Sequence, residues 1–310
     1  MTVLPTPFGG IVDAHAHVFA AAHRIPRVVD DLAPADRDEP VQNLLATMKD
    51  HGVTSAVLVP LAGEDDYIRQ VVQTFPDRFA AVAVATPREQ GLVEGVEPAA
   101  ALLQRRASLP FVALRSRWLA PPGTAVEDSP MFPTLQSMAQ QGIALWSYLP
   151  PEQLGALTRL VQVLPDLTVV LNHLGFAPNG MHVDEHQRPF FLDALPRDRV
   201  DAVLAMSAAP NVHVMLSGLY ALSSEAWPYR DLWPMVRQIS DAYGVSRLLW
   251  ASDYPWPRTI PGYGALIEAA VLSLGDVPTD ALDQVFAGNA RALFGLPAPV
   301  KNFLDAKDEL

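Results

Sequence analysis

The sequence predicts an α/β protein folded as a (β/α)8 TIM barrel, a single domain over residues 1–310. Apolar segments of strand length, rich in β-branched residues, alternate with helical segments eight times along the chain. The length suits one such barrel, and no internal repeat or linker indicates a second domain. A doubly wound open sheet shows the same alternation, but no G-x-G-x-x-G or P-loop motif follows a predicted strand, which favours the barrel.

The apolar runs predict eight strands, near Ile11–Phe19, Ser55–Leu61, Phe79–Thr86, Phe111–Trp118, Ile143–Leu149, Leu167–Gly175, Val212–Leu219 and Leu248–Trp256. The segments between and after them predict eight helices, at Val41–His51, Asp65–Phe75, Val96–Ser108, Met131–Gln141, Pro151–Leu164, Phe190–Ser207, Pro228–Tyr243 and Tyr263–Leu274.

Composition excludes several classes of protein. Half of the residues are hydrophobic, enough for a large core, but no apolar run reaches the roughly 18 residues that cross a bilayer. The net charge of −12, spread along the chain, argues against a nucleic-acid or anionic-membrane partner. Because the chain has no cysteine, any metal site must use nitrogen and oxygen ligands.

The chain ends bear on localisation. No basic segment followed by an apolar one opens the sequence, so we expect a cytoplasmic protein without a signal peptide. Residues 307–310 match an ER-retention signal. Since no import signal accompanies it, we interpret this match as coincidence.

In a (β/α)8 barrel the active site lies at the carboxyl ends of the strands. Ionisable and polar residues gather where the predicted strands end, and the candidates are His15, His17, Arg115, Arg117, Tyr148, His173, Tyr220 and Asp253. This agreement in position predicts a single site. By contrast, His213 begins the seventh strand, at the opposite end of the barrel.

The most informative segment is the first strand, which ends in His15-Ala16-His17. Side chains at i and i+2 of a strand share a face, so Asp13, His15 and His17 are expected to point the same way. Two imidazoles about 7 Å apart along a strand can converge on one metal ion, carbonyl oxygen or water. Alternatively, both histidines are structural hydrogen-bonding residues.

Two later segments provide groups that complete such a site. His173 follows an apolar strand, and Asp253 ends another, where a buried carboxylate requires a cation, a metal or several donors. Asp253 is the natural general base or metal ligand. Arg115 and Arg117 share a strand face and could bind a carboxylate through forked hydrogen bonds, unless one pairs with Asp13.

Four motifs together carry a resemblance to a known family: Asp13-x-His15-x-His17, Asn172-His173-Leu174-Gly175, Trp250 to Pro255, and the closing Gly288 to Phe294. The chain resembles the amidohydrolase superfamily, in particular the amidohydrolase-2 branch. This branch contains 2-pyrone-4,6-dicarboxylate lactonase, sugar-acid lactonases and metal-dependent decarboxylases.

The resemblance implies roles for the candidate residues. In metal-bearing members the strand-1 histidines and the strand-8 aspartate hold a divalent ion together with a strand-5 histidine, which this chain lacks. Its strand-5 tyrosine and strand-4 arginines instead resemble the pyrone lactonase, which works without metal. By that similarity Asp253 would activate water, while His15, His17 and His173 polarise a lactone carbonyl. The groups that would hold the substrate are Arg115, Arg117 and Tyr148, and we add Tyr220 as a further pocket residue.

Three functions follow as hypotheses. The first is a hydrolase that opens a lactone of a small carboxylated compound, with no cofactor required. The second is a decarboxylase that uses one divalent ion, Zn²⁺ or Mn²⁺, bound by His15, His17, His173 and Asp253. The third is a barrel that binds a ligand without turning it over. A homo-oligomer is compatible with each.

Overall fold

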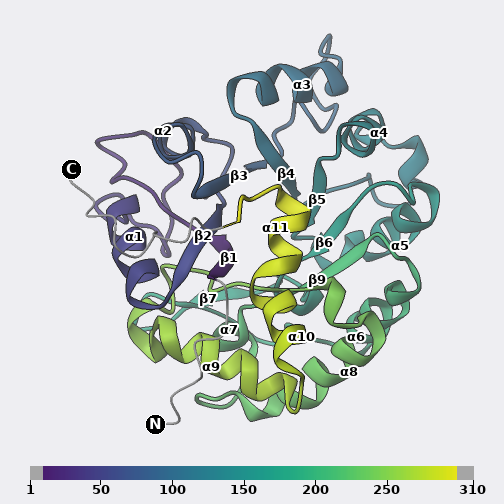
Figure 1. Cartoon of the computed structure of the whole chain (residues 1–310). Coiled ribbons are helices and arrows are strands. Elements are labelled where there is room, and N and C mark those ends of the chain that lie inside the picture. The colour runs from purple at the N-terminus through teal and green to yellow at the C-terminus, as the bar shows by residue number, and fades with distance from the viewer. Residues whose placement is uncertain (1–9, 299–310) are drawn as a thin grey trace.

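A computed structural model describes residues 10–298 of the chain. Residues 307–310, which match the retention signal, lie outside the described residues. The model contains eight parallel strands that form a nearly closed barrel, with helices around it (Figure 1). This confirms the predicted fold class.

The barrel strands follow chain order except for an inserted hairpin. They are β1 (Ile11–Ala16), β2 (Val53–Leu58), β3 (Phe79–Val84), β4 (Phe111–Ser116), β5 (Ala144–Ser147), β6 (Val169–Leu171), β9 (Val212–Leu216) and β10 (Leu248–Trp250). Closure occurs just past β10, where His17 N donates to Tyr254 O at 2.7 Å and Asp253 N donates to His15 O at 3.0 Å. The first and last segments of the barrel are therefore joined beside the predicted site.

Helices cover the outside of the barrel. They are α1 (Val41–Asp50), α2 (Asp66–Thr74), α3 (Pro98–Ser108), α4 (Phe132–Gln141), α5 (Leu154–Val163), α6 (Arg197–Ala205), α7 (Leu219–Leu222), α8 (Trp233–Tyr243), α9 (Tyr263–Leu274), α10 (Thr279–Asp283) and α11 (Asn289–Phe294). None of the helices within residues 10–298 combines the length and the apolar character that crossing a membrane requires.

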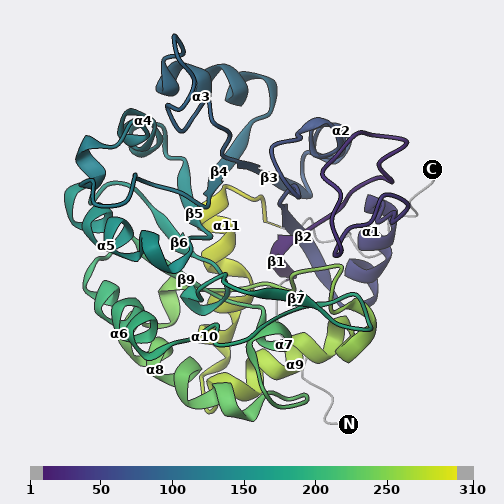
Figure 2. The same ribbon diagram turned by 180° about the vertical axis from the view of Figure 1, so that it is seen from behind.

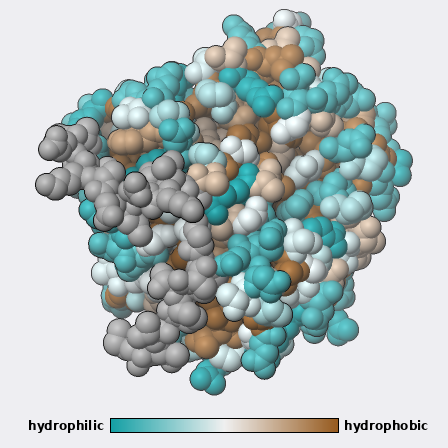
Figure 3. Space-filling model, viewed as in Figure 1, coloured by the Kyte–Doolittle hydropathy of each residue, from teal (hydrophilic) through white to brown (hydrophobic). Residues whose placement is uncertain are grey.

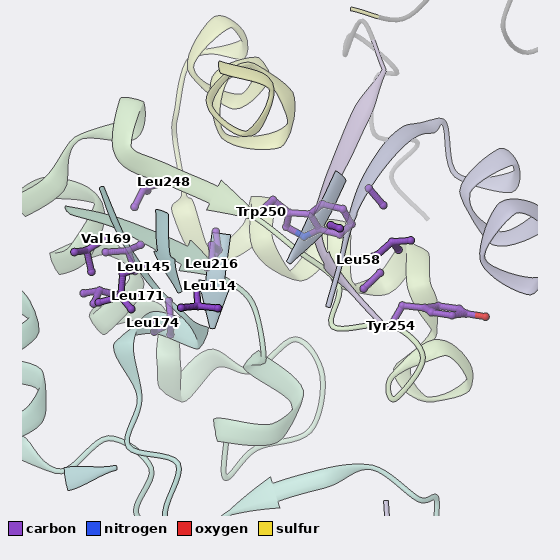
Figure 4. Packing of buried hydrophobic residues seen from close by; sticks show 14 of the residues in the cluster. Leu58, Leu114, Leu145, Val169, Leu171, Leu174, Leu216, Leu248, Trp250 and Tyr254 are labelled. Atoms are coloured by element: carbon purple, nitrogen blue, oxygen red, sulfur yellow. The ribbon is translucent and has the colours of Figure 1, made fainter. Parts of the chain in front are cut away.

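Strand side chains alternate between two cores. On β6, Val169 and Leu171 belong to the layer between strands and helices, whereas Val170 belongs to the barrel interior. Figure 4 shows the outer layer, where Leu145, Val169, Leu171 and Leu174 lie together. Successive side chains of a strand thus enter two different apolar layers, which is why the strand is apolar at every position.

The C-terminal helix α11 closes one end of the barrel. It lies over the centre of the barrel in Figure 1, and its Phe294 ring stacks on Trp146 of the interior at 6.0 Å. The face around it shows mixed hydrophilic and hydrophobic side chains (Figure 3). Figure 2 looks at the opposite end of the barrel, which α11 does not cover.

The predicted helix Phe190–Ser207 is wrong at its start. The segment instead contributes to an antiparallel hairpin, β7 (Met181–Val183) with β8 (Pro189–Phe191), and α6 begins only at Arg197. Pro196 caps α6, and Asp193 has a positive φ of 55°, so the chain turns between the strand and the helix. The hairpin lies across the face of the barrel seen in Figure 2.

The predicted strands are also too long at their carboxyl ends. The sixth ends at Leu171 and the eighth at Trp250, and both are followed by turns with positive φ. His173 and Asp253 are therefore held by turns beyond the strands, at φ angles of 43° and 61°. Hydrophobic patterning carries no signal for such turns.

Candidate active site

An irregularity in β1 directs its two histidines into the barrel. The pairing with β2 runs Asp13 to Ala56 and then Ala16 to Leu58, so β1 has one extra residue there. The Asp13 carboxylate accepts from Ser252 and from Tyr263 of α9 and does not line the cavity. The expectation that Asp13 shares a face with His15 and His17 is therefore wrong, because the extra residue breaks strict alternation.

Asp253 lies at the centre of a buried cluster of three imidazoles. His15 Nε2 and His17 Nε2 each lie 3.6 Å from Asp253 Oδ1, and His173 Nε2 lies 3.6 Å from Oδ2. All four side chains are buried. Residues from three distant parts of the chain thus form the single cluster that the motifs predict.

The cluster keeps Asp253 ionised. Burial raises the pKa of Asp253, but the nearby imidazoles outweigh it and hold the pKa well below the usual range of a carboxyl. Burial has the opposite effect on the imidazoles, lowering the pKa of His15 strongly and that of His173 to about 4, although Asp253 partly offsets both. His15 and His173 are therefore neutral near pH 7.

Tyr220 contacts the carboxylate rather than the open cavity. Its hydroxyl donates to Asp253 Oδ2 at 2.6 Å, and burial followed by the adjacent carboxylate raises the pKa of Tyr220 well above its usual value. The neighbouring Ala221 lines the cavity instead. Tyr220 is thus placed to orient Asp253.

Each imidazole is oriented by a partner at Nδ1. His17 Nδ1 donates to Val59 O at 2.7 Å, His15 Nδ1 lies 3.2 Å from Asn172 Oδ1, and His173 Nδ1 lies 2.8 Å from Ser217 Oγ. Ser217, His173 and Asp253 therefore form a Ser–His–Asp series. Ser217 does not line the cavity, so its hydroxyl orients the imidazole and is not placed as a nucleophile.

The two histidines of β1 approach each other closely. Their Nε2 atoms are 3.0 Å apart, and His17 Nε2 carries only a lone pair when neutral, since Nδ1 holds the proton given to Val59 O. Either His15 donates an Nε2 proton, or a cation lies between the lone pairs. The Asn172 Nδ2 group is buried without a partner, and rotation of this amide would supply the donor that the first arrangement needs.

These atoms also fit a divalent ion. The edges between His15 Nε2, His17 Nε2 and Asp253 Oδ1 are 3.0, 3.6 and 3.6 Å, the spacing of neighbouring ligands around an ion with bonds of about 2.1 Å. His15, His173 and Asp253 likewise place ligand atoms within 4.8 Å of one another. The nitrogen and carboxylate donors suit Zn²⁺ or Mn²⁺.

One wall of the cavity carries two guanidinium groups. Arg115 and Arg117 lie over the Tyr148 ring, with their Cζ atoms 4.1 and 5.3 Å from its centroid. Among residues 10–298, no carboxylate lies within 4.0 Å of either guanidinium. Asp13, considered as a partner above, is engaged elsewhere. Two cations without an acidic partner suit an anionic ligand.

Loops and the hairpin complete a cavity of about 110 Å³. From the sequence, Trp256 after the eighth strand was a possible pocket residue, and it does line this cavity. Sequence reasoning missed the other residues that cover it, namely Asp30, Leu32, Ala33, Leu61, Met181, Pro189 and Phe191. Trp256 also packs against His17, with ring centroids 5.6 Å apart. The missed residues belong to no predicted motif, so the sequence did not single them out.

A family model described as amidohydrolase matches residues 12–296. The chain belongs to the amidohydrolase family. The resemblance drawn from the four motifs is thereby confirmed.

A curated relative of this amidohydrolase is L-fucono-1,5-lactonase from Burkholderia ambifaria. The two are 30% identical over 184 residues, 56% of this chain and 57% of the lactonase. A second relative, from Sinorhizobium fredii, matches over 41% of its length. The chain thus spans about half the length of the curated relatives it matches.

Solved structures share the fold over almost the whole chain. One is a putative 2-pyrone-4,6-dicarboxylic acid hydrolase from Pseudomonas putida, with a TM-score of 0.69, 22% identity, and coverage of 94% of this chain and 99% of that one. An amidohydrolase from Burkholderia multivorans with bound zinc has a TM-score of 0.71, 18% identity, and coverage of 93% and 100%. A 5-carboxyvanillate decarboxylase from Sphingomonas paucimobilis has a TM-score of 0.60, 17% identity, and coverage of 93% and 99%.

Proposed function

We propose that this protein hydrolyses the lactone ring of a small carboxylated compound, with Asp253 as the general base. The observation that carries the proposal is a buried, ionised carboxylate facing three imidazoles beside two guanidiniums without an acidic partner. The lactonase named above supports the same class of reaction.

The reaction needs a base and a stabilised oxyanion. Asp253 takes a proton from water as the water oxygen attacks the lactone carbonyl, and the ring C–O bond then breaks. The proton on Asp253 passes to the departing alkoxide, so the carboxylate is regenerated. Because a carboxylate with a depressed pKa is a weak base, much of the rate must come from stabilising the oxyanion.

His173 is the imidazole best placed to stabilise that charge. The Ser217 hydroxyl can donate to His173 Nδ1, which leaves a proton on Nε2 toward the cavity. His17 is less suited, because its Nδ1 proton is given to Val59 O. His15 Nε2 lies 3.0 Å from His17 Nε2, so His15 is engaged in orienting the His17 imidazole.

The substrate carboxylate belongs at the wall that carries the two guanidiniums. Arg115 and Arg117 present guanidinium donors there, and the cation–π contact of each with the Tyr148 ring limits their motion. This placement would hold the lactone carbonyl over Asp253. Carboxylated lactones are therefore favoured over neutral ones.

A divalent ion, when bound by His15, His17 and Asp253, would add Lewis-acid polarisation of the carbonyl. The steps above use side chains alone. The metal-competent cluster also favours a second candidate, decarboxylation of a small aromatic or unsaturated acid. Metal dependence separates the two candidates.

The test is a panel of lactones assayed by proton release. Each carboxylated lactone is paired with its methyl ester, and the protein is assayed after chelation and after addition of Zn²⁺ or Mn²⁺. We expect opening of at least one carboxylated lactone, activity that survives chelation, and a higher KM for the ester. Inactivity toward every lactone, with metal-dependent release of CO₂ from an aromatic acid, would establish the second candidate instead.

A further inference from the structure

Helix α6 carries an arginine whose charge is buried without an acidic partner. Arg199 is 3% exposed, and its Nη1 makes no hydrogen bond. Within residues 10–298 no carboxylate lies within 4.0 Å of the guanidinium, and burial lowers the pKa of Arg199 to about 10. Burying a cation in this way is costly, so the residue calls for an explanation.

Within the described part of the chain the guanidinium makes one hydrogen bond, to a turn that carries an active-site residue. Arg199 Nε donates to Gly175 O at 2.7 Å. Gly175 ends the turn His173–Gly175, in which the three successive φ angles are 43°, 59° and 75°. Residues with a side chain rarely adopt such angles, so this turn stores strain and needs support from its surroundings.

Helix α6 supports the turn at two points. Besides the Arg199 bond, Val203 packs so closely on Gly175 that a Cβ there would lie 2.6 Å from Val203 Cγ2. The other end of the turn holds His173, whose Nε2 lies 3.6 Å from Asp253 Oδ2. Gly175 and His173 are only two residues apart in this turn, so a displacement of the Gly175 carbonyl would displace the imidazole as well.

We propose that Arg199 is a positioning residue, whose guanidinium holds the Gly175 carbonyl and thereby the strained turn that presents His173 to Asp253. The charge serves placement of His173 rather than global stability. This distinguishes Arg199 from the partly buried Arg105, which is paired with Asp65 at 2.6 Å.

The two possible roles differ in the sign of their effect on stability. Replacing Arg199 by methionine keeps the apolar stem and removes the buried charge, so the thermal midpoint should stay the same or rise. If the arginine instead holds the fold together, the midpoint should fall. Only the positioning role loosens the turn while the molecule stays stable.

Hydrogen–deuterium exchange of the full-length protein tests this without a substrate. The turn amides Gly175 N and Phe176 N donate to Asn172 O and His173 O, so they report directly on its order. In Arg199→Met we expect exchange over residues 172–177 to rise about tenfold, with an unchanged or higher midpoint. The control is Arg197→Met on the same helix, because that side chain is 95% exposed and should leave the exchange unchanged.

Turnover gives a second readout, which rests on the proposed function. On the best lactone we expect Arg199→Met to lower kcat about tenfold with KM nearly unchanged. In Arg199→Lys we expect part of the kcat, and part of the protection of the turn amides from exchange, to be regained. If the wild type opens no lactone, the proposed function fails while the exchange data still judge Arg199. Unchanged exchange at residues 172–177 would overturn the inference. A lowered thermal midpoint in both Arg199 variants, with exchange raised throughout the molecule, would also overturn it. If Arg199→Met does not fold, Arg199→Lys decides, and exchange over residues 172–177 as fast as in an unprotected segment would overturn the inference.

Discussion

At the scale of single residues, the site depends on how Asp253 is surrounded. Its two oxygens are divided between His15 and His17 on one side and His173 and Tyr220 on the other. This arrangement offsets the cost of burying a carboxylate.

Removing the Tyr220 hydroxyl tests the orientation of Asp253. In Tyr220→Phe, the carboxylate loses its donor at 2.6 Å, so it becomes less well held while it stays ionised. A hydrogen bond to a charged group contributes about 1.5–3 kcal/mol, so we expect kcat to fall roughly 10- to 100-fold. KM should change little, since Tyr220 does not line the cavity.

The matched control is Tyr67→Phe, which removes a half-buried hydroxyl on α2 that accepts from Val41 N at 3.0 Å, at the start of α1 on the outside of the barrel. Steady-state kinetics on the best lactone should show full turnover in this control. If Tyr220→Phe raised KM and left kcat unchanged, Tyr220 would act on the substrate rather than on Asp253.

At the scale of elements, two structural features decide what the barrel can do. The extra residue in β1 turns both histidines inward, and α11 closes the far end of the interior. The histidine motif was visible in the sequence, but the irregularity was not, because a single inserted residue leaves the hydrophobic pattern almost unchanged. No helix was predicted over α11, although its Gly288 to Phe294 motif was recognised.

The closing role of α11 can be measured through Phe294. This ring packs on Trp146 within the interior core, so Phe294→Ala leaves a cavity that the surrounding strands cannot move in to fill. We expect the free energy of unfolding to fall by about 3–5 kcal/mol in denaturant titrations. Leu272→Ala on the exposed side of α9 should cost less than about 0.5 kcal/mol. Equal effects of both substitutions would show that α11 is not part of the core.

His213 at the start of β9 makes a prediction about pH. Burial, with the adjacent Arg247, lowers the pKa of this half-buried imidazole from 6.5 to about 4, and its Nδ1 has no hydrogen-bond partner. The unfolded chain therefore binds the proton more tightly, and His213 destabilises the fold progressively as pH falls from about 6.5 to 4.

In His213→Gln, the part of the fall in unfolding free energy that comes from His213 disappears. Between pH 7 and pH 4.5 we expect the variant to lose less unfolding free energy than the wild type, by roughly 1–2 kcal/mol. The measurement is denaturant unfolding at each pH, with the exposed His186→Gln as control. Parallel curves for the wild type and His213→Gln would contradict the assigned protonation.

At the scale of the whole molecule, the alternation of strand and helix segments predicted the barrel, and the position of His15, His17, His173 and Asp253 at the ends of predicted strands predicted that they gather. Both follow from the order of apolar segments along the chain, a property that sequence records directly. The cover of the cavity was not predictable. Leu32, Phe191 and their neighbours come from loops and a hairpin whose course depends on tertiary contacts rather than on local pattern.

Arg199 illustrates the same limit. A helix with a basic residue in its first turn gives no reason to expect a buried charge, and only the fold brings it to the carbonyl of Gly175. The strained turns at His173 and Asp253 are likewise a property of the assembled barrel. Chemistry-bearing residue types were thus visible in the sequence, whereas Arg199 and Ser217, which position His173, were not.

Turnover by Asp253→Asn tests the central claim most directly. Asparagine keeps the shape and tolerates the positive φ of this position, but it cannot accept a proton from water. With the lactone that the wild type opens fastest, we predict a loss of kcat of about a thousandfold, with the thermal midpoint preserved. A variant that opens this lactone within about threefold of the wild-type rate would contradict the role of Asp253 as the base.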